Sequence, residues 1–183
     1  MPTCRIRRSL LPLAMTATLG LAGLTPATAD DKPRYLPFRA GGSFTEVLGA
    51  PTAECAQSAP PGGSAASGAI TGSGLASSVG SFTLTSLDCI TSASPHLLPP
   101  LRFSSRQFVL TDVNGDTLVA EYEGKATELP TGFIALTGTF VFSGGSGRFH
   151  GAKGSGTIEG VEDIGSTPGG GTGHVLLMGK ISR

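Results

Sequence analysis

The segment from Leu136 to Gly160, LTGTFVFSGGSGRFHGAKGSGTIEG, joins strand-forming residues to a turn. Its first part, up to Phe142, is rich in the β-branched and aromatic residues that favour strands. The glycine- and serine-rich stretch 143–147 supplies residues that tolerate positive φ, as a tight hairpin turn requires. The segment is therefore predicted to form a β-hairpin.

The second strand of this hairpin carries Gly151, Gly154 and Gly156. Glycine at this density inside a strand indicates bulges, bends or the close approach of a neighbouring backbone. Sharp bending of strands is what a small closed barrel requires. The hairpin therefore points to a barrel.

Short segments with alternating polarity, separated by turn residues, continue along the chain. Asn114-Gly115 is a strong hairpin signal between two of them. No apolar period of 3.6 residues persists beyond the first 29 residues, so no helix is predicted there. The expected strands cover 42–48, 69–77, 81–90, 102–111, 117–126, 133–142, 149–161 and 174–181. We predict an all-β domain, an eight-stranded antiparallel up-and-down β-barrel, with a two-sheet β-sandwich as the alternative.

The first 29 residues have the layout of a cleaved secretory signal peptide. Arg5, Arg7 and Arg8 precede an apolar run, and Ala27-Thr28-Ala29 provides a cleavage site. We therefore expect export to the periplasm or the extracellular space, and Arg7-Arg8 leaves twin-arginine export open beside the general route. The apolar run is too short and too interrupted to span a membrane, and no membrane insertion is predicted. The expected organisation is a signal at 1–29, a loose lead-in at 30–40 and one domain at 41–183.

Removal of the signal changes the charge of the chain. The whole chain has 13 basic and 13 acidic residues, and the signal contains three arginines and no acid. The mature chain therefore has a formal charge of −3, which disfavours nucleic acid as a partner.

Cys55 and Cys89 are the two cysteines of the mature chain. In an oxidising compartment such a pair is expected to form a disulfide. A metal site and a reactive thiol are the alternatives, and neither has supporting ligands nearby in the sequence. The structural disulfide is the prediction.

The stretch from Phe142 to Gly156, FSGGSGRFHGAKGSG, resembles the GGTGRFxGAxGxG segment of the allene oxide cyclase and dirigent barrels. The preceding stretch from Leu110 to Asp116, LTDVNGD, is similar to the hairpin found there in secreted bacterial relatives. The resemblance implies a β-barrel in a family that includes cyclases, proteins that steer radical coupling, and many exported proteins. The matching positions are mostly glycine and carry no catalytic residue over to this chain.

The usual catalytic and cofactor motifs are missing from the sequence. Neither the phosphate-binding G-x-x-x-x-G-K-[ST] pattern nor G-x-G-x-x-G occurs. His96, His150 and His174 are far apart and have no metal-ligand spacing. No cofactor and no metal are expected, and the catalytic residues stay unassigned.

Alternation along the strands suggests which side chains face the interior. Arg106 lies two positions before Phe108 and is therefore expected on the same face of its strand. Tyr122 likewise shares a face with the apolar residues of its own strand, and Phe140 belongs to a row of apolar side chains on one face. We predict Arg106, Phe108, Tyr122 and Phe140 as ligand-binding residues, although Arg106 could instead extend to the rim. Glu121 and Glu123 have the opposite parity and are expected to face solvent.

Two functions follow from this interpretation. In the first, the barrel binds a small hydrophobic molecule, with cyclase or isomerase activity as a further step that depends on orientation and exclusion of water. In the second, a filled barrel is a non-enzymatic envelope or extracellular protein. A cavity above about 300 Å³ lined by the four predicted residues would favour ligand binding. The sequence leaves the ligand, the enzymatic activity and the oligomeric state open.

Overall fold

The computed structural model describes residues 33–130, 132–165 and 168–182. The predicted signal peptide and residues 30–32 of the predicted lead-in lie outside the described residues. No described helix has both the length and the apolar character needed to cross a membrane.

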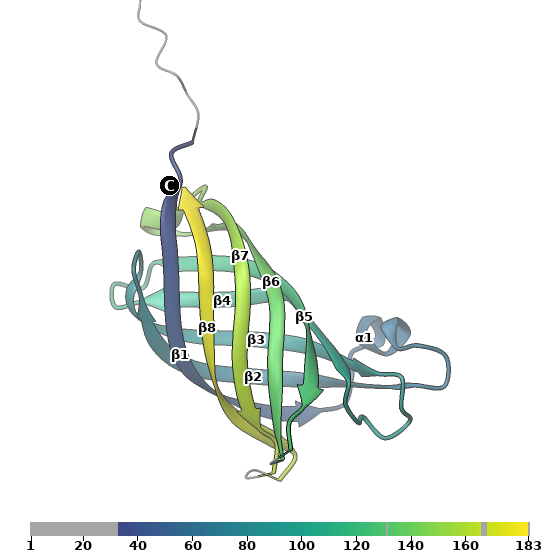
Figure 1. The fold of residues 1–183 in the computed structure, drawn as a ribbon. Helices are drawn as coiled ribbons and strands as arrows, with labels where there is room; N and C mark the ends of the chain where they lie inside the picture. Colours follow the sequence, from purple (N-terminus) through teal and green to yellow (C-terminus); the bar gives the residue numbers. More distant parts are fainter. Residues whose placement is uncertain (1–32, 131, 166–167, 183) are drawn as a thin grey trace, which may run out of the picture. The chain divides into compact units, whose positions relative to one another are not determined.

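Eight antiparallel strands form a closed barrel in which each strand pairs with the next and β8 pairs with β1 (Figure 1). This confirms the predicted up-and-down barrel and excludes the β-sandwich. The strands are β1 (Leu36–Gly49), β2 (Ser64–Ala76), β3 (Gly80–Ser92), β4 (Leu101–Asp112), β5 (Thr117–Glu128), β6 (Phe133–Gly145), β7 (Lys153–Asp163) and β8 (Gly170–Ser182).

Three segments differ from the expected secondary structure. β1 begins at Leu36, inside the segment 30–40 that was expected to be loose, because Phe38 and Ala40 already point into the core. A short helix, α1 (Ala53–Ser58), begins after Thr52, whose hydroxyl accepts a hydrogen bond from the Cys55 N–H. A 3-10 turn, η1 (Gly147–Phe149), follows β6, and its Phe149 is buried.

Close approach of side chains explains glycines inside the strands. A Cβ atom at Gly156 would lie 2.7 Å from the ring of Phe140, and one at Gly173 would lie 2.6 Å from the ring of Phe44. Any other residue would displace these rings and would also meet a backbone carbonyl oxygen, that of Met178 at 2.1 Å from a Cβ at Gly156 and that of Val161 at 2.5 Å from one at Gly173. The glycine density of the sequence therefore makes room for large side chains from neighbouring strands, as well as permitting curvature.

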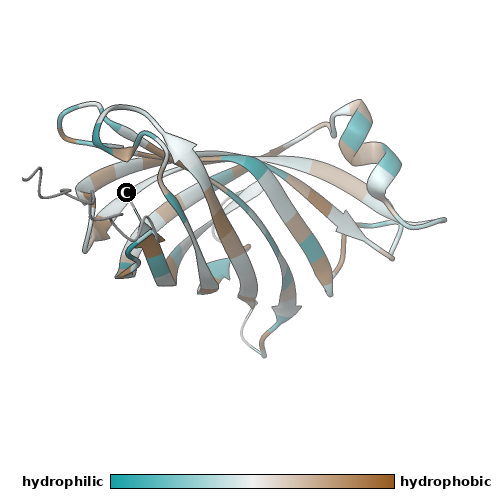
Figure 2. Ribbon diagram, turned by 90° about the horizontal axis from the view of Figure 1, so that it is seen from above, coloured by the Kyte–Doolittle hydropathy of each residue, from teal (hydrophilic) through white to brown (hydrophobic). Residues whose placement is uncertain are grey.

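One half of the barrel interior is filled with aromatic and aliphatic side chains, and we call it the filled half. The ring of Phe142 lies 4.9 Å, between centroids, from the rings of both Phe38 and Phe140. Hydrophobic and hydrophilic residues alternate in short bands along the strands, as period-2 strands with one buried face require (Figure 2). The fully buried large side chains are Phe38, Leu110, Leu118, Phe140, Phe142, Phe149, Leu177 and Ile181.

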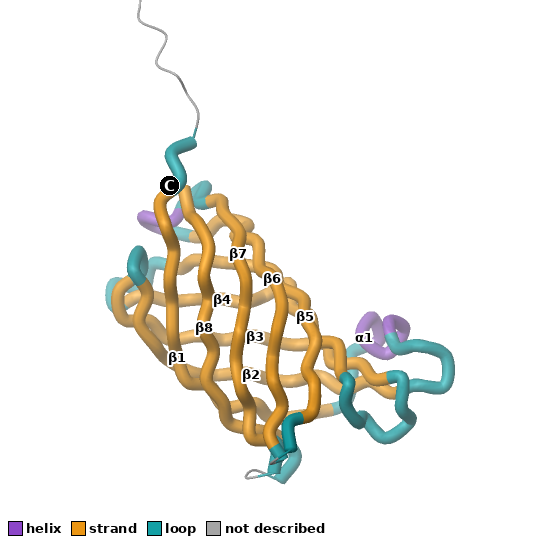
Figure 3. Tube along the Cα trace, in the orientation of Figure 1, coloured by secondary structure: helices purple, strands orange, loops and turns teal. Residues whose placement is uncertain are grey.

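Polar groups close the filled half at its end. Asp112 Oδ1 accepts hydrogen bonds from the backbone N–H groups of Asn114 and Asp116, so the predicted Asn114-Gly115 turn joins β4 to β5. The Arg148 guanidinium lies 2.6 Å from Asp112 Oδ2 and donates to the Val79 carbonyl. α1 and its long connections lie at the opposite end of the barrel (Figure 3).

Candidate functional site

The other half of the interior contains a cavity of about 80 Å³. We call this region the acidic half, for the three carboxylic acids described below. The volume is well below the roughly 300 Å³ at which sites for drug-sized ligands begin. Most of the lining is apolar, and the full set is Phe44, Glu46, Ile70, Leu84, Asp88, Ile90, Leu101, Phe103, Phe108, Tyr122, Ala126, Ile134, Leu136, Ile158, Glu162, Val175 and Leu177.

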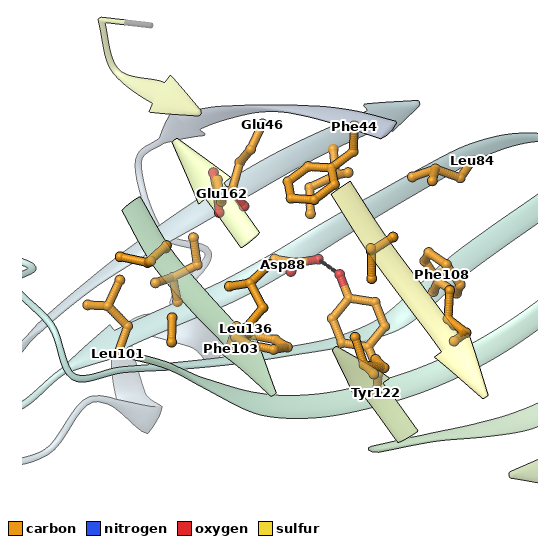
Figure 4. A pocket seen from close by; sticks show the side chains of 17 residues that line it. Phe44, Glu46, Leu84, Asp88, Leu101, Phe103, Phe108, Tyr122, Leu136 and Glu162 are labelled. Carbon is orange, nitrogen blue, oxygen red and sulfur yellow. Dashed lines mark hydrogen bonds between the residues drawn. The ribbon is translucent and has the colours of Figure 1, made fainter. Parts of the chain in front are cut away.

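Three acidic side chains reach the cavity from alternate strands. Glu46 comes from β1, Asp88 from β3 and Glu162 from β7, and their exposed fractions are only 8%, 4% and 4%. Each has the inward parity of apolar neighbours on its own strand, so strand alternation alone directs it into the barrel. Figure 4 shows the Glu46 and Glu162 side chains close together, with Asp88 nearer Tyr122.

Glycines on the strands between them provide space for two of the carboxyl groups. A Cβ atom at Gly68 on β2 would lie 2.0 Å from Glu46 Oε1, and one at Gly171 on β8 would lie 2.1 Å from Glu162 Oε1. Both distances are too short for any real Cβ atom. The carboxyl groups therefore occupy volume that any other residue at these two positions would need.

Asp88 is held by hydroxyl groups. The Tyr122 hydroxyl donates a hydrogen bond to Asp88 Oδ1 (Figure 4), and Ser86 Oγ lies 2.7 Å from the same oxygen. Ser86 Oγ is in turn 2.8 Å from Ser105 Oγ, which donates to the Leu87 carbonyl. This network fixes the position of the Asp88 carboxylate.

Burial separates the protonation states of the acids. Burial, together with the negative charges of Glu162 and Asp88, raises the pKa of Glu46 to about 8. Burial also raises the pKa of Asp88 to about 6, although hydrogen bonds from Tyr122 and Ser86 oppose the increase. At pH 7, Glu46 is therefore mainly neutral and Asp88 mainly ionised.

Glu162 is the partner of the neutral Glu46. The two carboxyl groups are hydrogen-bonded to each other, and burial raises the pKa of Glu162 although this bond opposes the increase. Glu162 Oε1 is buried and has no N–H or hydroxyl partner among the described residues. A buried acceptor of this kind is costly, because it has lost water without gaining a donor.

The structure does not bring all four residues predicted to bind a ligand to one site, although Arg106, Tyr122 and Phe140 line an open groove together. Phe108 and Tyr122 line the cavity, whereas Phe140 belongs to the filled half. The inward placement of Arg106 is wrong, because the pairing of β4 with β5 shifts between Ser105 and Phe108 and leaves Arg106 exposed. Ligand binding by any of the four stays a prediction.

The three acids of the cavity are the residues that the sequence interpretation missed. Strand alternation provides a signal for them, because each acid lies an even number of positions from buried apolar residues of its own strand. The pairs are Glu46 with Phe44, Asp88 with Phe82 and Leu84, and Glu162 with Ile158. Glu121 and Glu123 are exposed as predicted. Strand alternation therefore predicted the outward face correctly for the two acids to which it was applied.

The disulfide between Cys55 and Cys89 is confirmed, with an S–S distance of 2.13 Å. It attaches α1 to β3 directly beside Asp88. It therefore fixes the loop before β2 against the acidic half.

This arrangement is suited to general acid–base chemistry, because a neutral acid and an ionised acid face one apolar cavity. Within the described residues, no three histidine, cysteine, aspartate or glutamate side chains are arranged to hold a metal ion. Comparison of the sequence with models of protein families, with curated proteins and with solved structures finds no match.

Proposed function

We propose that the barrel binds a compact, largely apolar molecule in its acidic half and moves a proton between two positions of it, as a cofactor-independent isomerase or cyclase. One observation carries the proposal: neutral Glu46 and ionised Asp88 share a cavity whose other walls are almost entirely apolar. Pairs of acids with separated pKa values are typical of sites that use one group as acid and the other as base.

The chemistry needs only these groups. The Asp88 carboxylate accepts a proton from a carbon next to a double bond, and the electron pair of the broken C–H bond shifts that double bond. Glu46 donates its proton at the far end of the shifted system, so the substrate gains and loses one proton. Asp88 then returns its proton to Glu46, directly or through water, which restores the starting state.

Three further observations support this proposal. The resemblance of the segment from Phe142 to Gly156 to allene oxide cyclase and dirigent barrels fits a barrel whose interior orients a reactive molecule. The Cys55–Cys89 disulfide fits export to the periplasm or beyond, where thiols are oxidised. A cavity of about 80 Å³ fits a molecule smaller than benzene, which occupies an engineered cavity of roughly 150 Å³ in another protein.

A non-enzymatic barrel is the second candidate function. The small volume of the cavity and the complete filling of the other half favour it. In that case the three acids would bind no ligand, and their only measurable effect would be to lower the free energy of unfolding.

Proton transfer to and from solvent tests the proposal. The protein is incubated in D₂O with a panel of unsaturated ketones, alcohols and amines of about three or four carbons, and deuterium incorporation is followed by NMR. We expect incorporation or double-bond migration in at least one compound, with loss in Asp88→Asn and Glu46→Gln. Glu121→Gln is the matched control, because Glu121 is exposed on the outside of β5. If no compound of the panel exchanges deuterium faster with the protein than without it, the proposed function is wrong and the non-enzymatic barrel is supported.

A further inference from the structure

The charge of the cavity is unbalanced. Glu46, Asp88 and Glu162 line it, and no arginine, lysine or histidine is among the residues that do. The hydroxyl groups of Tyr122 and Ser86 solvate Asp88, but they carry no positive charge. Buried charge without a counter-ion is strongly unfavourable, so the site as built favours a positively charged occupant.

The second observation is the orientation of Glu162. Its side chain is almost completely buried and lines the cavity, yet its Oε1 atom has no donor among the described residues. Gly171 allows the Glu162 carboxyl group to lie against β8, because a Cβ atom at this position would lie 2.1 Å from Oε1. The barrel thus presents an acceptor oxygen that its own side chains leave unused.

We propose that the ligand of this cavity is a compact aliphatic ammonium ion, of about three or four carbons, whose nitrogen lies between the carboxyl groups of Glu46 and Glu162. This inference rests on the proposed function for the binding site alone, because a cation that displaces the Glu46 proton is a ligand on which Glu46 cannot act as the acid. An ammonium group has three N–H donors, which is enough to reach Glu162 Oε1 and a Glu46 oxygen together. The hydrocarbon part lies against the apolar wall formed by Phe44, Ile70 and Val175.

A cation explains this arrangement better than a neutral molecule does. A neutral alcohol can donate one hydrogen bond to Glu162, but it leaves the negative charge of the cavity uncompensated. An anion would add to the repulsion. An ammonium ion satisfies the unused acceptor and the charge at once, while the surrounding aliphatic and aromatic walls select for an apolar body.

Binding of a cation should release a proton. The groups that face Glu46 are Glu162 on β7, Asp88 on β3 and Tyr122 on β5. The adjacent β2 contains no ionisable side chain, and His174 and Lys180 of β8 are exposed. An ammonium ion beside Glu46 lowers its pKa from about 8, so affinity should rise with pH between about 6 and 8.

The experiment compares three probes of matched shape: isobutylamine, isobutanol and isobutyrate. Affinities for the full-length mature protein are measured by calorimetry at three pH values and in two buffers of different ionisation enthalpy, which yields the number of protons released. We expect the amine to bind about tenfold or more tightly than the alcohol, with proton release, and isobutyrate not to bind. Glu162→Gln should remove most of this preference, whereas Glu159→Gln, exposed on the same strand, should retain it.

The other outcomes contradict either the ammonium ligand alone or the proposed function as well. If isobutanol binds as tightly as isobutylamine, the ammonium ligand is wrong and the proposed function survives. If none of the three probes and no compound of the deuterium-exchange panel binds, both fail. If Mg²⁺ or Ca²⁺ binds at the acids and displaces the amine, the cavity is a metal site and this inference is wrong. Glu46→Gln provides a second variant, should Glu162→Gln alter the fold.

Discussion

The filled half and the acidic half are built on the same eight strands, but their interiors differ in composition. In the filled half, Gly156 leaves space that the Phe140 ring occupies, whereas in the acidic half Gly68 and Gly171 leave space for the carboxyl groups of Glu46 and Glu162. The same device, a glycine between two inward-facing side chains, thus serves packing at one end and charge at the other. The comparison teaches that aromatic packing and buried acidic groups are separated along the barrel axis.

The largest expected effect is on the filled half. Phe140→Ala should lower the free energy of unfolding by about 4 kcal/mol, because it removes a fully buried ring and leaves a void among Phe38 and Phe142. Phe103→Ala, at a half-buried position beside the cavity, should lower it by only about 1 kcal/mol. Urea unfolding of both variants measures the difference. Equal losses would show that the two halves are packed alike.

The disulfide should have the next largest effect, this time at the acidic half. Cys55 and Cys89 are separated by 34 positions, and closing a loop of this size stabilises a protein by about 4 kcal/mol in the chain-entropy model, a value that strain in the native state reduces. The double variant Cys55→Ala/Cys89→Ala should therefore unfold at a lower temperature in thermal melts. Reductant should lower the melting temperature of the wild type and leave that of the double variant unchanged. A wild-type melting temperature that is insensitive to reductant under unfolding conditions would contradict the prediction.

The acids should make the protein less stable as the pH rises. The pKa of Glu46 is about 8 in the folded state and 4.5 for an ordinary glutamate. Between these values the folded state binds more protons than the unfolded state, so the free energy of unfolding falls from about pH 5 to about pH 8. The raised pKa values of Asp88 and Glu162 act in the same direction.

Glu46→Gln tests the pH effect, because a neutral side chain has no charge to bury. The variant should gain on the order of 2 kcal/mol relative to the wild type at pH 8.5, and little at pH 5. Urea unfolding across this pH range measures the slope for both proteins. The exposed Glu121→Gln serves as the control and should preserve the wild-type slope. A wild-type stability that rises between pH 5 and pH 8 would show that the acids are solvated.

The barrel could be predicted from sequence because its determinants are local. Alternation of polar and apolar residues, the Asn114-Gly115 turn and glycine-rich strands each specify backbone behaviour within a few residues. The beginning of β1 was missed because Pro37 and Arg39 make that segment look like a loop, although the parity of Phe38 and Ala40 is that of a buried strand. Arg106 was misplaced because a shift in strand pairing reverses parity, and no single residue type marks it.

The site could not be predicted in the same way because it depends on closure. The three acids are far apart in the sequence: Glu46, Asp88 and Glu162. The residues around each acid indicate only a polar position in a strand. Only pairing of β8 with β1 brings β7, β1 and β3 to one side of the interior. The consequence for sequence interpretation is specific: an acid that shares the parity of buried residues in a barrel strand is a candidate site residue.

The smallest expected effect concerns the hydrogen bond to Asp88. Tyr122→Phe removes the hydroxyl donor but retains a ring that lies 5.3 Å, between centroids, from Phe108. Loss of one hydrogen bond to a charged group should lower stability by about 1.5 kcal/mol at neutral pH. It should also raise the pKa of Asp88 above its value of about 6, because the hydrogen bond favours the ionised form. NMR titration of the Asp88 carboxyl carbon measures this shift directly.

The exposed Tyr35, which lies just before β1, provides the matched control for this variant. Tyr35→Phe should leave both the stability and the pKa of Asp88 unchanged, because its hydroxyl is far along the strand from the acidic half. If Tyr122→Phe also leaves the pKa of Asp88 unchanged, the tyrosine does not tune the base of the proposed reaction. The difference between the pKa values of Glu46 and Asp88 would then depend on burial, on the charges near Glu46 and on the Ser86 hydrogen bond to Asp88.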